Sequence, residues 1–179
     1  MIFKHLGKNA KIFDTAKVIN SENISIGDES LIADFSFLYA VGKGIEIGNF
    51  CHVTEHGIIQ AGGLVKMGDF SAIGPRTTIL AATDDYEGNG LIGLKVLDKY
   101  RNTTFKDVYI GRHAHIGMGC IIMPGVSIGE GCSIGAGSLV TKDMPAWTIC
   151  YGHPCRPVKD KPSVKILEME KEFLQEYYG

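Results

Sequence analysis

Three carboxylates that could accept a proton stand together in the segment 84–87, where Asp84 and Asp85 are followed by Tyr86 and Glu87. A side chain acts as a general base when it is positioned within reach of the proton that the reaction releases. No histidine occurs from position 57 to position 112, so the carboxylates are the candidate bases in this stretch. The alternative is a solvated acidic turn in which Asp84 only caps the preceding strand, and this segment alone leaves both hypotheses open.

A regular spacing of aliphatic residues shows which elements must hold this cluster. Aliphatic side chains recur six positions apart in the second half of the chain, at Ile110, Ile116, Ile122, Ile128, Ile134 and Val140. Six is the period neither of a helix nor of a simple strand. A hexapeptide repeat predicts a parallel β-helix, in which each repeat forms one short rung and three rungs complete one turn of a three-sided prism.

The same repeat continues upstream and is interrupted at regular places. The earlier rungs fall into four groups of three: Leu6, Ile12, Val18; Ile26, Ile32, Leu38; Ile47, Val53, Ile59; and Met67, Ile73, Ile79. Two, three, two and twenty-five extra residues follow these groups in turn. Every insertion therefore leaves the prism at the same corner, and Asp84 stands where the longest one begins. A loop of that length in a compact domain is usually functional.

We therefore expect an all-β fold with one domain over residues 1–161, a β-helix of about six coils. Residues 84–107 form its excursion loop, and the stretch after Pro145 is expected to be irregular. Residues 162–179 are predicted to form a C-terminal α-helix with Ser163 as its N-cap. The apolar stripe of this helix should pack on the prism or on a neighbouring subunit.

Composition excludes several classes of function. A net charge of −2 and a pI near 6.3 do not provide the basic face that nucleic acids require. No stretch approaches the eighteen apolar residues of a membrane span, and the N-terminus has no apolar run of signal-peptide length, so we expect a soluble cytoplasmic protein. Cys51, Cys120 and Cys132 occupy a repeat position that small residues fill elsewhere, which predicts buried, reduced thiols.

Other motifs for catalysis are weak or missing. The run Gly88–Gly93 matches a dinucleotide fingerprint as a string, but it neither follows a buried strand nor precedes a helix, so we reject that match. The chain has no nucleophile elbow around a serine and no cysteine beside an evident histidine partner. Covalent catalysis by the protein has no support, and this favours direct transfer in a ternary complex.

The block from Ile110 to Pro145, followed by Gly152-His-Pro-Cys-Arg156, resembles the hexapeptide-repeat acyltransferases. The nearest groups are the galactoside and maltose O-acetyltransferases, the xenobiotic acetyltransferases and the acetyltransferases of surface-polysaccharide synthesis. The resemblance implies a left-handed β-helix and a homotrimer with an acyl-CoA site between neighbouring prisms. Its motifs place the cofactor-binding residues at Met118, Ala136, Thr141, Lys142, Arg156 and Lys159. The cations among them suit the phosphates of acetyl-CoA.

The catalytic side departs from this family. Its base is a histidine that begins the long excursion, and the matching residue here is Asp84. Either Asp84 takes over, or His52 or His56 reaches in from a lower coil, or the protein is inactive; Asp85 is a further carboxylate candidate. A sugar hydroxyl needs a base of near-neutral pKa, whereas a neutral amine can attack a thioester and then give its proton to a weak base. The carboxylate therefore slightly favours N-acetylation over O-acetylation.

The sequence thus predicts an acetyl-CoA-dependent acetyltransferase that acts on a sugar, a sugar nucleotide or a polysaccharide precursor. One alternative is a catalytically silent β-helical binding or scaffold subunit. A less favoured one is a zinc lyase that resembles the trimeric β-helical carbonic anhydrases, with histidines such as His52 and His115 sharing an ion at a subunit interface. We expect no metal site, because one chain places those two histidines two coils, or about 10 Å, apart.

Overall fold

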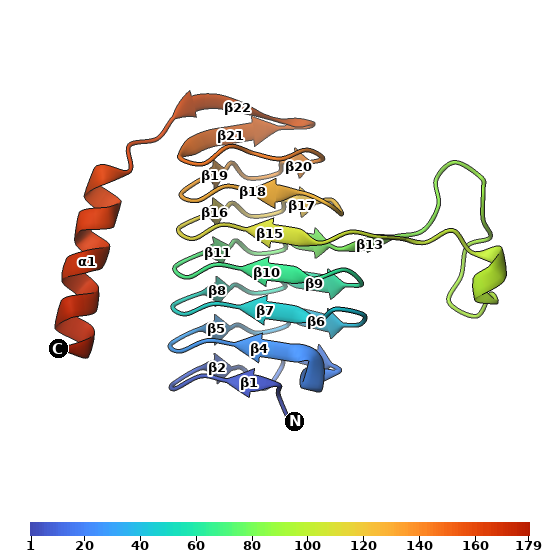
Figure 1. Ribbon diagram of the computed structural model, residues 1–179, viewed down its shortest axis with the longest axis horizontal. Helices are drawn as coiled ribbons and strands as arrows, with labels where there is room; N and C mark the ends of the chain where they lie inside the picture. Colours follow the sequence, from blue (N-terminus) through green and yellow to red (C-terminus); the bar gives the residue numbers. More distant parts are fainter.

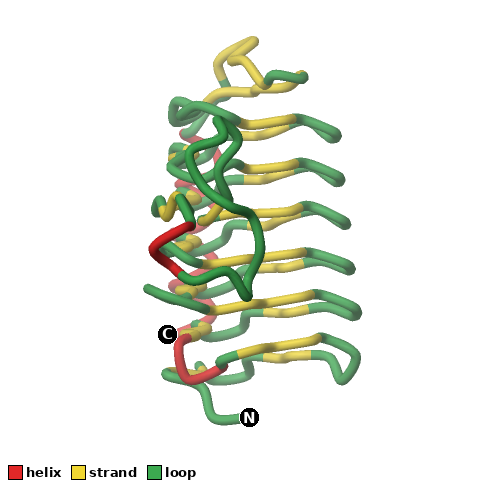
Figure 2. Tube along the Cα trace, turned by 90° about the vertical axis from the view of Figure 1, so that its right-hand side faces the viewer, coloured by secondary structure: helices red, strands yellow, loops and turns green.

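The computed structural model describes residues 1–179 as an upright three-sided prism, with a long arm on one side and a helix on another (Figure 1). Each wall of the prism is a sheet of parallel short strands, one from every coil, and one of the walls ends in an antiparallel pair. Figure 2 shows the coils as level tiers, with the arm crossing in front of the middle ones. None of the helices is long and apolar enough to cross a membrane.

The three walls are named here sheets A, B and C. Sheet A contains β1 (His5–Leu6), β4 (Ile24–Ile26), β7 (Ile45–Ile47), β10 (Val65–Met67), β15 (Val108–Ile110) and β18 (Ser127–Ile128). Sheet B contains β2 (Lys11–Ile12), β5 (Leu31–Ile32), β8 (His52–Val53), β11 (Ala72–Ile73), β16 (His115–Ile116), β19 (Ser133–Ile134), β21 (Thr148–Gly152) and β22 (Cys155–Asp160). Sheet C contains β3 (Lys17–Ile19), β6 (Phe37–Ala40), β9 (Ile58–Ala61), β12 (Thr78–Leu80), β17 (Ile121–Ile122) and β20 (Leu139–Val140).

The hexapeptide repeat sets both the coil and its core. Residues six apart face the prism axis, and Ile73, Ile79 and Ile116 are fully buried there, as are most of their counterparts. Burying one such side chain contributes about 1.5–3 kcal/mol, so the single core that runs up the axis holds the coils together. Strands of sheet A run from right to left on the near side of Figure 1 while the chain climbs and sheet B lies behind, which makes the β-helix left-handed.

The coil count and the insertion corner agree with the repeat. Six complete coils are present, and a seventh is begun by Met144, which bridges to Ile128, and by β21, which pairs with β19. All four insertions leave from the corner between sheets C and A, here the CA corner. The first insertion contains the 3-10 turn η1 (Ser21–Asn23).

Two segments are more regular than the sequence predicted. The excursion starts and ends as an antiparallel ribbon of β13 (Ala82–Thr83) and β14 (Thr104–Phe105), and it contains the 3-10 turn η2 (Asp98–Tyr100). We call residues 82–107 the arm. The stretch after Pro145 is a β21–β22 hairpin, so the expectation of an irregular segment was wrong. Buried Thr148 and Cys150 alternate with less buried neighbours there, which is a strand signal.

The C-terminal helix α1 (Val164–Tyr178) runs down the corner between sheets A and B, the AB corner. Ser163 precedes it as predicted, although its hydroxyl makes no capping bond and its carbonyl instead accepts from Ile166 and Leu167. The apolar stripe of α1 packs on the prism: the rings of Phe173 and Tyr177 lie 5.2 and 5.4 Å from the ring of Phe50.

Candidate active site

A hollow of about 230 Å³ lies where the arm leaves the CA corner. Its floor comes from the outer face of sheet C and its walls come from the arm. The residues that line it are Tyr39, Val41, Gln60, Ala82, Thr83, Asp84, Leu94, Arg101, Thr103 and Phe105. We call it the arm pocket.

Strand alternation explains the floor of the arm pocket. Along β6 and β9 every second residue is buried, so the residues between them point outward. Tyr39 and Gln60 are outward residues that stand opposite each other in the parallel register. The floor therefore offers an aromatic ring and an amide beside the point where the arm begins.

Asp84 forms the polar wall of the arm pocket. Its Oδ1 atom accepts hydrogen bonds from Thr103 Oγ1 at 3.1 Å and from Arg101 Nη2 at 3.4 Å. The carboxylate side chain is 37% exposed, so it still reaches the hollow, whereas the Arg101 side chain is 18% exposed. The Arg101 Nε atom is buried and has no hydrogen-bond partner. The site thus presents the Asp84 carboxylate with the positively charged guanidinium of Arg101 beside it.

Asp85 does not line the arm pocket and instead bonds to two other residues of the arm. Its Oδ2 atom accepts from the Asn89 backbone N–H at 2.6 Å, and its Oδ1 atom accepts from Asn102 Nδ2 at 3.0 Å. Desolvation acts to raise the pKa of Asp85, but these hydrogen bonds together hold it below its ordinary value. The geometry gives Asp85 a role in loop structure.

His56 lies at another corner of the prism, between sheets B and C, here the BC corner. Its ring stacks on that of Phe35 with 5.1 Å between centroids, in the turn before β9. The arm leaves from the opposite edge of sheet C, and His56 does not line the arm pocket. One chain therefore does not bring His56 beside Asp84.

The residues predicted to bind CoA are all exposed and lie in the last coils of the prism, at both ends of the strands of sheet C and on the last strand of sheet B. Met118 and Ala136 stand in successive turns of the BC corner, and Thr141 and Lys142 follow β20 at its other end. Arg156 and Lys159 lie on β22 above them. One Arg156 N–H donates to the carbonyl of Cys155 at 2.7 Å, which leaves its other donors free.

The BC corner has an open ledge beside these residues. Gly119 and Gly137 adopt φ values of 66° and 70°, and a Cβ atom added at either would meet no atom within 4 Å. The Gly137 N–H donates to the Met118 carbonyl at 2.8 Å, which holds the two turns together. Bare backbone of this kind can receive a narrow, flexible chain such as pantetheine.

The cysteines are buried, and the chain forms no cluster of metal ligands. All five cysteines are free and buried. Burial raises the pKa of the Cys132 thiol to about 12, which leaves it unsuited to take up an acyl group. No three His, Cys, Asp or Glu side chains converge as ligands of a metal ion.

Asp84 is the one lining residue that was predicted from the sequence as a site residue, and the other nine were not, among them Tyr39, Gln60, Arg101, Thr103 and Phe105. Phe105 and Thr103 could have been found, because a loop that leaves and re-enters one corner must bring its last residues beside its first. Tyr39 and Gln60 could have been found by extending the outward register of sheet C to the CA corner. Nothing in the sequence indicates the pairing of Arg101 with Asp84.

Comparison with known proteins agrees with this architecture. The family model described as bacterial transferase hexapeptide (six repeats) matches residues 107–142. A dTDP-4-amino-4,6-dideoxy-D-glucose acyltransferase of Escherichia coli is 37% identical over 173 residues, which are 97% of this chain and 90% of that protein.

Two solved structures share the fold at different levels of similarity. AntD, an N-acyltransferase from Bacillus cereus in complex with dTDP and 3-hydroxybutyryl-CoA, superposes with a TM-score of 0.92 at 36% identity, covering 99% of this chain and 93% of that one. A maltose O-acetyltransferase from Clostridium difficile 630 gives a TM-score of 0.62 at 25% identity, covering 90% and 71%. The chain belongs to the hexapeptide-repeat acyltransferases, as its coils, its arm and these relatives together show.

Proposed function

We propose that this protein transfers an acyl group from acyl-CoA to the amino group of a nucleotide-linked amino sugar, of the dTDP-4-amino-4,6-dideoxyhexose type. The observation that carries the proposal is a carboxylate, Asp84, at the position where the O-acetyltransferases of the family are expected to have a histidine. The similarity to the Escherichia coli acyltransferase over nearly the whole chain supports the same acceptor class.

The chemistry follows from the acceptor. The neutral amine attacks the thioester carbonyl carbon, forming a C–N bond and a tetrahedral intermediate whose nitrogen is acidic. Asp84 takes the nitrogen proton, the C–S bond breaks, and CoA leaves as the thiolate. A carboxylate is basic enough for this proton, because the nitrogen becomes acidic only after the attack. Arg101 and Thr103 keep the Asp84 carboxylate oriented.

The acyl donor is proposed to lie on the ledge of Gly119 and Gly137, with Met118 and Ala136 beside the pantetheine. Lys142, Arg156 and Lys159 would pair with the phosphates. Acetyl-CoA is the donor predicted from the sequence, and the AntD complex makes 3-hydroxybutyryl-CoA a second donor to compare.

A homotrimer is proposed as the working assembly, in the cytoplasm. Apolar side chains of the arm are left uncovered in one chain, with Leu91 at 61%, Ile92 at 69%, Leu94 at 81% and Leu97 at 64% exposure. Phe35 at the BC corner is 58% exposed as well. Apolar patches rimmed by polar residues are typical of protein–protein contacts.

Release of CoA thiol in the presence of each acceptor tests the proposed function. The reaction mixtures contain acetyl-CoA or 3-hydroxybutyryl-CoA with dTDP-4-amino-4,6-dideoxyglucose, or with dTDP-glucose as the matched acceptor that has no amine. We expect thiol release in the mixtures that contain the amino sugar and none in those that contain dTDP-glucose. Release with dTDP-glucose at the same rate would reject N-acylation, and no release with any acceptor would favour a silent binding subunit.

A further inference from the structure

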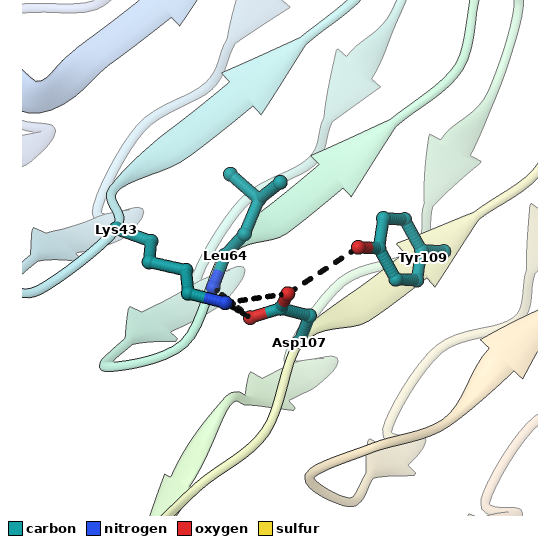
Figure 3. A network of polar contacts seen from close by, with 4 residues as sticks. All are labelled: Lys43, Leu64, Asp107 and Tyr109. Carbon is teal, nitrogen blue, oxygen red and sulfur yellow. Dashed lines mark hydrogen bonds and ion pairs between the residues drawn. The ribbon is translucent and has the colours of Figure 1, made fainter.

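The carboxylate of Asp107 ties three successive coils together at the CA corner, where the arm re-enters the prism. Its Oδ2 atom lies 2.9 Å from Lys43 Nζ, and its Oδ1 atom accepts from the Leu64 backbone N–H at 2.8 Å (Figure 3). The Tyr109 hydroxyl donates to Oδ2 at 3.3 Å. Lys43 lies in the insertion after the second coil, Leu64 in the insertion after the third, and Asp107 where the arm re-enters the prism.

We propose that Asp107 and Lys43 form a clamp that positions the arm, so that Asp107 is a positioning residue for the acceptor side of the reaction. This inference rests on the proposed function for its kinetic readout. Its structural readout, the mobility of the arm, is independent of any substrate.

The path from the clamp to the arm pocket is short. Asp107 is two residues after Phe105, the last residue of β14, and Phe105 stands opposite Ala82 in the ribbon. The next pair, Thr83 with Thr104, sets the position of Asp84 and of its donor Thr103. Holding residue 107 therefore fixes the register that places the proposed base.

The insertions below the arm leave little room for another arrangement. A Cβ atom added at Gly63 would lie 2.6 Å from the Lys106 carbonyl carbon and 2.9 Å from the Asp107 nitrogen. A Cβ added at Gly62 would lie 2.6 Å from the Phe105 ring. The backbone of the third insertion thus packs closely against residues 105–107 at the end of the arm, and the ion pair of Asp107 with Lys43 lies beside this contact.

The clamp keeps its charges over the working pH range. The side-chain hydrogen bond from Lys43, followed by the bond from the Leu64 N–H, holds the pKa of Asp107 below its ordinary value of 3.8. The Asp107 carboxylate in turn raises the pKa of Lys43 above 10.5. Between the lowered pKa of Asp107 and the raised pKa of Lys43, the carboxylate stays ionised and the ammonium stays protonated. The effect of the clamp should therefore not change from pH 5.5 to 8.5.

Asp107→Asn and Lys43→Met break the ion pair from its two sides, and Asp107→Ala also leaves the Leu64 N–H without its partner. Because the pair is partly exposed, each of the first two variants should raise the acceptor KM about two- to fivefold. Asp107→Ala should raise it about ten- to a hundredfold. Affinity for CoA should stay unchanged in all three variants. The Tm of the prism should stay unchanged in Asp107→Asn and Lys43→Met, in which the Leu64 N–H can keep its partner, and Lys43→Arg should keep the wild-type acceptor KM.

Lys66→Met is the matched control, because Lys66 forms its ion pair on sheet A, with Glu46 at 3.3 Å, and not with a residue of the arm. Amide hydrogen exchange gives the second readout: exchange should rise in residues 84–105 of the Asp107 variants and nowhere in the strands of sheets A to C. Exchange in the arm equal to that of wild type, or an equal rise in Lys66→Met, would overturn the clamp. If no acceptor is acylated, the exchange result still stands and only the proposed function fails.

Discussion

The Asp84 carboxylate lies 3.4 Å from the Arg101 guanidinium, although 17 residues separate them in the sequence. The β13–β14 ribbon brings them together, because a loop that returns antiparallel on itself must place its two ends side by side. This pairing gives the arm pocket a carboxylate that is held on one side by Arg101 and exposed on the other to the hollow.

Asp84→Asn tests the proposed base. The amide keeps the shape of the side chain but cannot take a proton, so kcat should fall by roughly 10²–10⁴ while the affinity for CoA is retained. Steady-state kinetics and calorimetry with CoA measure the two effects. Glu87→Gln, at an exposed carboxylate three residues further along the arm, is the control and should keep full turnover. Near-normal turnover in Asp84→Asn would move the role to Asp85, or to His56 or His52.

Lys142 and Arg156 are expected to bind the CoA phosphates. Arg156→Ala should remove a charge-assisted contact of about 1.5–3 kcal/mol, and the remaining affinity should depend less on salt. Titration calorimetry with CoA at two salt concentrations measures both effects. Lys165→Ala, an exposed cation on α1, serves as the control. An unchanged CoA affinity in the Lys142→Ala/Arg156→Ala double variant would show that this assignment is wrong.

The trimer is expected from the uncovered apolar side chains of the arm and the BC corner. Light scattering should give a mass near three times the 19.4 kDa of the chain, independent of concentration in the micromolar range. Leu94→Asp/Leu97→Asp places two charges on the exposed arm and should weaken assembly if this patch is covered. A monomer at every concentration would reject both the oligomer and a site shared between prisms.

The buried carboxylate of Glu170 should anchor α1 to the fifth coil. It contacts the Arg112 guanidinium, and its Oε2 atom lies 3.1 Å from His113 Nε2. Glu170→Ala should lower stability by about 1.5–3 kcal/mol, which corresponds to a fall in Tm of roughly 3–10 °C for a domain of this size. Glu168→Ala, an exposed change on the same helix, should alter Tm little. Equal Tm values for the two variants in scanning calorimetry would contradict the anchor.

The fold could be predicted from the sequence because one short-range rule, an aliphatic residue every six positions, determines the core of every coil. Ile79 and Ile110 keep that rule on either side of the arm, so the register survives the insertion. The hairpin after Pro145 was missed, because β21 and β22 leave the hexapeptide rule and pair with each other.

The site was predicted only in part. The position of Asp84 at a corner follows from counting repeats, whereas its partners depend on how the arm folds back. Arg101 and Thr103 reach Asp84 through the ribbon, and Lys43 reaches Asp107 across two coils. Such contacts join residues that no local pattern connects, so the structure was needed to find them.

The most direct test follows the acyl group itself. The protein is incubated with carbonyl-labelled [13C]acetyl-CoA and dTDP-4-amino-4,6-dideoxyglucose, and the quenched products are analysed by mass spectrometry and 13C NMR. Direct transfer to the amine predicts one label per sugar in an amide, one free CoA thiol per product, and no label on the protein. Label in an ester of the sugar, or covalently bound to the protein, would contradict N-acyl transfer through a ternary complex.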